Sequence, residues 1–149
     1  MPISLPSGPD AETLVNYILE TYPETDVVQA MNAWFFSLDA EKHWPNYATI
    51  VTTDEHDDAS DLSRPGTYRL NIGVDRSTFR RVADADPEPD YTAFDRLLPH
   101  PVYAKQLWIS IVNPSHETFD EVVRPLLALA HDRLAAARAR HTPARRSSG

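Results

Sequence analysis

The stretch from residue 68 to residue 74 constrains the fold more than any other part of this 149-residue chain. Its sequence, YRLNIGV, places Tyr68, Leu70, Ile72 and Val74 at alternate positions, with arginine, asparagine and glycine between them. Successive side chains of a β-strand point to opposite faces, so this alternation predicts a half-buried strand. The apolar face of such a strand needs a covering layer, which amphipathic helices can supply.

Apolar residues recur at helical spacing over residues 10–22 and again from Ser115 to about residue 138. Asp10 and Ser115 are suited to cap these helices, and Pro125 predicts a kink or a broken first turn in the second. The other predicted elements are strands at 27–30, 33–38, 48–52 and 107–112, a short helix at 77–82 and one helical turn at 94–98. The sequence thus predicts an α+β fold, with a mostly antiparallel sheet of about five strands packed by an N-terminal and a long C-terminal helix.

Composition divides the chain into three parts and excludes several classes of function. Residues 1–9 hold three prolines and are predicted to be a disordered lead-in, residues 10–138 one domain, and residues 139–149 a basic flexible tail. There is no cysteine, and the four glycines form neither a phosphate-binding loop nor a dinucleotide fingerprint; GxSxG and HExxH motifs are also missing. We therefore expect no thiol chemistry, no metal and no cofactor.

Charge is distributed unevenly along the chain. Residues 1–132 carry nine basic and 22 acidic side chains, whereas residues 133–149 carry five arginines and no acid. The acidic body should repel a polyanion, so DNA binding would have to depend on the tail, and we expect no nucleic-acid partner. No apolar run is long enough to span a bilayer and no signal peptide is evident, so we expect a cytoplasmic protein.

Two phrases, RPGTYRLNIGV (64–74) and LLPHPVYAKQLWISIVNPS (97–115), together with the segment TTDEHDDASDLSRPG (52–66), resemble an actinobacterial family of uncharacterised proteins. More distantly, the element order is similar to the MmcQ/YjbR-like group, which implies a small α+β fold related to the bacterial frataxin shape. This resemblance covers roughly residues 10–135. It implies a fold but no reaction, although DNA binding has been considered for the YjbR-like group.

Three segments could carry chemistry. The loop 54–61 packs five acids and His56 into eight positions, but it lacks the glycine and glutamate of a calcium loop, so a solvated loop of Asx-turns competes with a metal or acid–base role. In the strand 68–74, Arg69 and Asn71 share a face and could anchor a carboxylate or phosphate; alternatively, Arg69 pairs with an acid of the preceding loop.

The third segment is 99–105, where His100 lies between two prolines beside Tyr103 and Lys105. Its rigid backbone could orient His100 as an acid or base, or His100 and Tyr103 could simply close the end of the sheet. The three tryptophans, Trp34, Trp44 and Trp108, are expected mainly to pack, although the turn 43–45, which contains Trp44, could rim a pocket.

Three hypotheses follow. The first is a domain that binds a small molecule or a protein partner at the open sheet face, with Arg69, Asn71, Tyr103, Lys105 and Trp108 as ligand-binding residues. The second is an acid–base enzyme, such as a cyclase, isomerase or hydrolase of a specialised metabolite, with His56, His100 and Asp58 as catalytic residues and Asp57 as an alternative to Asp58. The third is DNA binding through the fold and the tail. Both a monomer and a homodimer fit the sequence.

Overall fold

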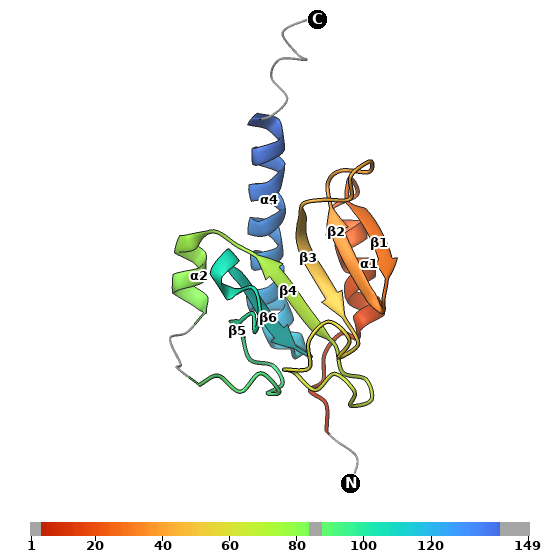
Figure 1. Cartoon of the computed structure of the whole chain (residues 1–149), viewed down its shortest axis with the longest axis vertical. Coiled ribbons are helices and arrows are strands. Elements are labelled where there is room, and N and C mark those ends of the chain that lie inside the picture. The colour runs from red at the N-terminus through yellow and green to blue at the C-terminus, as the bar shows by residue number, and fades with distance from the viewer. Residues whose placement is uncertain (1–3, 84–87, 141–149) are drawn as a thin grey trace, which may run out of the picture.

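The strands of the chain pair antiparallel into one open sheet (Figure 1), in a computed structural model that describes residues 4–83 and 88–140. The strands are β1 (Asp26–Ala30), β2 (Ala33–Ser37), β3 (Asn46–Val51), β4 (Arg69–Gly73), β5 (Leu98–Pro99) and β6 (Trp108–Val112). They lie in the order β1-β2-β3-β4-β6-β5, so β3, β4 and β6 form the middle of the sheet. The α+β class and the antiparallel sheet are as predicted.

The helices begin where capping side chains stand in the sequence. The helices are α1 (Ala11–Thr21), α2 (Arg76–Val82), α3 (His116–Thr118) and α4 (Arg124–Arg140), and a 3-10 turn spans Ala104–Gln106. Asp10, Asp75 and Ser115 each accept a hydrogen bond from the backbone N–H three residues later, at 2.8, 2.7 and 3.1 Å. These bonds satisfy donors that the first turn of a helix leaves free.

Pro125 interrupts the long C-terminal helix as predicted. Proline has no N–H to donate to the carbonyl four residues earlier, and its ring crowds that carbonyl. The chain widens into a π-helical turn over Phe119–Val123, where the N–H of Arg124 donates to the carbonyl of Phe119. The regular helix α4 resumes from Arg124.

The main hydrophobic core lies between one face of the sheet and the helices α1 and α4, which Figure 1 shows behind the same face. Leu70 and Ile72 of β4, with Ile109 and Ile111 of β6, are at most 1% exposed and contribute to it. The helices bury the apolar residues that repeat at helical spacing: Leu14, Val15 and Ile18 on α1, and Leu126, Leu127 and Ala130 on α4. The sequence periodicity predicted this arrangement.

Two local predictions were wrong. Residues 94–98 form no helical turn, because this segment pairs with the free edge of β6. Phe94 forms a bridge with Val112, and Leu98 begins β5, which brings the number of strands in the sheet from the predicted five to six. The strand β4 is also not half-buried. Arg69 and Asn71, on the face opposite the core, are only 2% exposed because the loop that precedes the strand folds over them.

The ends of the chain lie partly outside the described residues. In the predicted lead-in, residues 1–3 are not described, but Ser7 accepts a hydrogen bond from the N–H of His116 and the carbonyl of Pro9 accepts one from the Tyr68 hydroxyl. Helix α4 extends to Arg140, so most of the predicted tail, residues 141–149, lies outside the description. No helix within residues 4–83 and 88–140 is long and apolar enough to cross a membrane.

Candidate functional site

The loop between β3 and β4 folds back over the polar face of the sheet. Asp54 accepts a hydrogen bond from the N–H of Leu62 at 2.8 Å, and Asp57 accepts one from the N–H of Ala59 at 3.2 Å. Such Asx-type bonds hold a loop in shape without regular secondary structure. Asp54 and Asp57 thus accept hydrogen bonds from the backbone of their own loop. Within residues 4–83 and 88–140, no three side chains of the metal-binding types lie close enough together to hold a metal ion.

Arg69 and Asp57 form a two-pronged ion pair between β4 and this loop. Arg69 donates to Asp57 through its two terminal nitrogens at 2.9 and 2.7 Å, and one of these nitrogens also donates to the Ser60 hydroxyl at 3.0 Å. The Arg69 side chain is 2% exposed and that of Asp57 is 15% exposed. Hydrogen bonds from the guanidinium hold the pKa of Asp57 below its usual value of 3.8, although burial opposes this effect.

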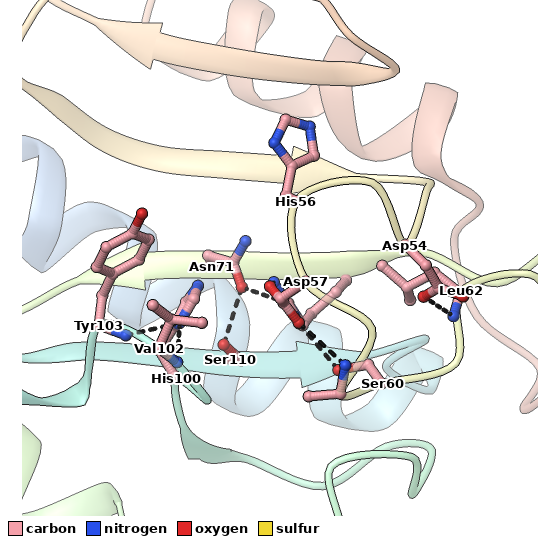
Figure 2. A network of polar contacts seen from close by, with 12 residues as sticks. Asp54, His56, Asp57, Ser60, Leu62, Asn71, His100, Val102, Tyr103 and Ser110 are labelled. Atoms are coloured by element: carbon pink, nitrogen blue, oxygen red, sulfur yellow. Dashed lines mark hydrogen bonds and ion pairs between the residues drawn. The ribbon is translucent and has the colours of Figure 1, made fainter.

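A chain of amide and hydroxyl groups extends the ion pair across the middle strands. The Arg69 Nε and the Ser110 hydroxyl both donate to the side-chain oxygen of Asn71, at 2.9 and 2.8 Å, and the Asn71 amide nitrogen donates to Thr49 at 3.0 Å. Figure 2 shows Asn71 and Ser110 between the acidic loop on one side and His100 and Tyr103 on the other. The side chains on the polar face of β4 therefore form a network in which they serve as hydrogen-bond partners for one another.

His100 lies at the opposite end of this network from Asp57, in the turn after β5. Its Nδ1 accepts hydrogen bonds from the backbone N–H groups of Val102 and Tyr103, both at 3.0 Å. Two N–H donors at one nitrogen require it to be unprotonated, so the neutral ring carries its hydrogen on Nε2. Burial, with a smaller contribution from the charge of Arg69, lowers the pKa of His100 from 6.5 to about 4. His100 is thus a neutral hydrogen-bond donor at physiological pH.

His56 stands in the acidic loop at the β3 side of the network (Figure 2) and is exposed. Its Nε2 lies 3.0 Å from the carbonyl of Met31, and its ring meets that of Phe35 edge-on at 6.4 Å between centroids. A carbonyl can only accept, so Nε2 carries the hydrogen, and in the neutral form of the ring Nδ1 is an acceptor. The two histidines therefore present opposite hydrogen-bonding character.

These groups line a common cavity, which we call the hollow. It has a volume of about 350 Å³. Its lining comprises Phe35, Trp44, Asn46, Thr49, Val51, His56, Asp57, Arg69, Asn71, His100, Val102, Tyr103, Gln106 and Trp108. The size and the mixture of aromatic walls with a few polar groups are typical of small-molecule sites.

Comparison with known proteins gives this chain a family. Residues 9–146 match the family of unknown function DUF6194. The chain belongs to the DUF6194 family. No curated protein and no solved structure matches it. The resemblance of the sequence to a family of uncharacterised proteins is confirmed to that extent, and the family assigns no activity to the hollow.

The hollow of this DUF6194 chain brings together six of the eight residues predicted to bind or catalyse: His56, Arg69, Asn71, His100, Tyr103 and Trp108. Asp58 and Lys105 are exposed and are not among its lining residues. The loop turns Asp57 inward where Asp58 was predicted, and the 3-10 turn places Gln106 at the cavity where Lys105 was predicted. The interpretation that Arg69 pairs with an acid of the preceding loop matches the geometry.

Some lining residues of this family member were not predicted. Phe35, Thr49 and Val51 lie on β2 and β3, on the sheet face away from the main core, and strand alternation could have placed them beside Arg69 and Asn71. Trp44 was expected to pack, yet it is 67% exposed at the cavity. Its place in the turn 43–45, outside the predicted strands that hold the other two tryptophans, was the sequence signal for a position at the rim of a pocket.

The hollow can therefore hold a flat molecule more readily than an isolated ion. The charges of Asp57 and Arg69 are matched to each other, so neither is free to attract a counter-charge. The Nε2–H of His100 takes part in none of the hydrogen bonds among the described residues. The buried Oδ1 of Asn46 also has no hydrogen-bond partner within that part of the chain.

Proposed function

We propose that this DUF6194 chain binds a small, uncharged aromatic molecule in the hollow. One observation carries the proposal: the polar floor of the hollow contains an ion pair whose charges cancel, and the half-open walls above it are aromatic. Phe35, Trp44, Tyr103 and Trp108 offer ring faces and edges. Aromatic pairs add roughly 0.5–1.5 kcal/mol beyond the burial of apolar area, which favours a flat, ring-shaped ligand.

The charges of the residues that line the hollow indicate that the ring of the ligand is uncharged. An anion in the hollow would have to compete with Asp57 for the guanidinium of Arg69, and Asp57 already takes two bonds from it. A cation would leave Arg69 without its partner, which is costly inside a protein. Because His100 is neutral at physiological pH, it supplies no charge for either kind of ligand.

Hydrogen bonding adds specificity. The Nε2–H of His100 can donate to a ring carbonyl or ring nitrogen of a ligand in the hollow. A site built to pair such groups rejects a ring that lacks them, because its own polar atoms are then left buried without partners. The best ligand is therefore a heteroaromatic ring that carries a hydrogen-bond acceptor.

An NMR titration observed on both ligand and protein tests the proposal with quinolin-4-one, which carries a ring carbonyl, and naphthalene, which has no hydrogen-bonding group. Quinolin-4-one should bind more tightly and should shift the indole N–H resonance of Trp108. Trp44→Ala and Tyr103→Ala remove exposed ring faces, and each should weaken binding roughly threefold to tenfold. Met31→Ala is the matched control, because Met31 is 65% exposed, close to the 67% of Trp44, and is not among the lining residues.

Equal binding of quinolin-4-one to the wild type and to the Trp44→Ala and Tyr103→Ala variants would contradict the proposal. So would resonance shifts confined to residues outside the hollow. Both substituted side chains are more than half exposed, so loss of the fold would not explain a loss of binding.

A second candidate function is acid–base catalysis on a carbonyl compound. The observation that favours it is the opposite character of the two histidines: His100 offers a hydrogen and His56 offers a lone pair at the same hollow. A neutral imidazole donor can stabilise a developing enolate while a base removes the neighbouring proton. This candidate predicts that His56→Ala abolishes turnover of a hydroxyl- or oxo-substituted ring while binding of that ring persists.

Other hypotheses stay predictions. The similarity to the MmcQ/YjbR-like group, the actinobacterial lineage, the cytoplasmic location, the action on a specialised metabolite and the protein partner have no support beyond the sequence. DNA binding through the fold and the tail depends on the five arginines from position 133 to position 146, of which Arg145 and Arg146 lie outside the described residues.

A further inference from the structure

A second cavity, which we call the recess, adjoins the hollow at the end of the sheet. It has a volume of about 270 Å³ and lies between helix α4 and the ends of β3, β4 and β6. Its lining comprises Pro45, Asn46, Tyr47, Gly73, Gln106, Trp108, Ala130, Arg133, Leu134, Ala137 and Arg140. Asn46, Gln106 and Trp108 line both cavities, so the hollow and the recess border each other at these three side chains.

Helix α4 supplies the recess with space and with positive charge. Residues 130, 133, 137 and 140 fall on one side of a helix because 3.6 residues make a turn. Alanine at positions 130 and 137 leaves room, whereas Arg133 and Arg140 extend beside it. Among the described residues that line the recess, these two arginines are the charged ones.

The electrostatic character of the recess is thus opposite to that of the hollow. In the hollow, Arg69 is neutralised by Asp57. Arg133 and Arg140 are exposed and have no carboxylate beside them in the recess lining. Asp75, which caps α2, is the nearby competitor: hydrogen bonds from Thr78 lower its pKa, and Arg133 adds a weaker electrostatic effect in the same direction.

Gly73 and Trp108 determine how the two cavities meet. A Cβ at Gly73 would lie 3.1 Å from the six-membered ring of the Trp108 indole, so the missing side chain lets the indole rest against β4. Gly73 and Trp108 are also opposite each other across the β4–β6 pair. One indole therefore bounds both cavities at the edge where they adjoin.

We infer that the ligand is a two-part molecule, an uncharged heteroaromatic ring joined by a short chain to an anionic group, and that Arg133 and Arg140 bind this anionic group in the recess. This inference rests on the proposed binding of the ring in the hollow. A phosphate or a carboxylate has the required chemistry, since a guanidinium donates charge-assisted hydrogen bonds to either.

The test compares pairs of probes that differ only in charge. Quinolin-4-one bearing a carboxylate on a chain of one, two or three carbons is titrated by calorimetry at 0.15 M salt, each beside its amide of nearly the same shape. The corresponding phosphates distinguish a preference for phosphate from one for carboxylate. In the best-fitting pair, the anion should bind about tenfold more tightly than the amide, because the ring contacts are shared and charge-assisted bonds are added.

The variant Arg133→Gln/Arg140→Gln should reduce this advantage to about twofold or less while leaving the affinity for the amide unchanged. Arg80→Gln/Arg81→Gln is the matched control. It removes the same charge from α2, whose residues line neither the hollow nor the recess. Its anion preference should equal that of the wild type, which separates a local contact from a general effect of net charge.

Each failure has a distinct meaning. If the amides bind but no anion binds more tightly at any chain length, the inference is overturned and the binding of the ring in the hollow stands. The inference is also overturned if the anion preference survives in Arg133→Gln/Arg140→Gln or is lost equally in the control. If neither amides nor anions bind, both the proposed function and this inference fail.

Discussion

Replacing Asp57 with alanine tests whether the ion pair with Arg69 holds the polar face of the sheet together. The substitution removes two of the four hydrogen bonds that the guanidinium donates, and it leaves one terminal nitrogen without a partner among the described residues. Arg69 is 2% exposed, so its guanidinium would lose its counter-charge inside the protein. Breaking a buried pair typically costs about 3–5 kcal/mol, and the 15% exposure of Asp57 favours a value near the lower end, about 3 kcal/mol.

Urea unfolding followed by circular dichroism measures this loss, with Asp58→Ala as the control. Asp58 is the next acid in the same loop and is exposed, so its replacement should change the free energy of unfolding by less than about 0.5 kcal/mol. The result also depends on pH. The folded-state pKa of Asp57 lies below 3.8, so its contribution is complete above that value and disappears as the pH falls through the folded pKa. The difference between wild type and Asp57→Ala should therefore shrink at acidic pH.

Equal effects of the two substitutions would refute the reasoning. In that case the loop would be held by its own backbone bonds, and Arg69 would find enough partners in Asn71 and Ser60. A large loss that does not shrink as the pH falls further and further below 3.8 would point instead to the packing of the Asp57 side chain and not to its charge.

Two further predictions concern the walls of the hollow. The imidazole of His100 should stay neutral, with its hydrogen on Nε2, down to about pH 4 in nitrogen-15 NMR spectra. Because the unfolded chain takes up this proton near pH 6.5, stability should fall between pH 6.5 and about 4, and His100→Asn should remove that part of the slope; titration near 6.5 would show that the ring is not buried as described. Gly73→Ala should displace the Trp108 indole, because the new methyl group would lie 3.1 Å from it, and should alter the near-ultraviolet circular dichroism. An unchanged spectrum together with unchanged ring binding would contradict the assigned position of the indole.

The sequence predicted part of the candidate site, because the alternation of side chains along a strand determines which face of the sheet each one occupies. Because Leu70 and Ile72 are apolar, Arg69 and Asn71 must share the opposite face, and the structure places them there. The same argument could not show that this face is buried, because burial depends on a loop that contacts β4 only in the folded chain. For the same reason, the sequence could not show which acid of the preceding loop pairs with Arg69.

Local sequence determined the elements of this protein. The caps at Asp10 and Ser115, the alternation in β4 and the disturbance at Pro125 each depend on neighbours within a few residues, so the sequence alone was sufficient for them. Only the tertiary structure decided that residues 98–99 add a sixth strand, that Trp44 is exposed at the hollow, and that α4 carries its arginines to the end of the sheet beside the ring site. These features join segments distant along the chain, and the packing that brings such segments together has no signature in either segment taken alone.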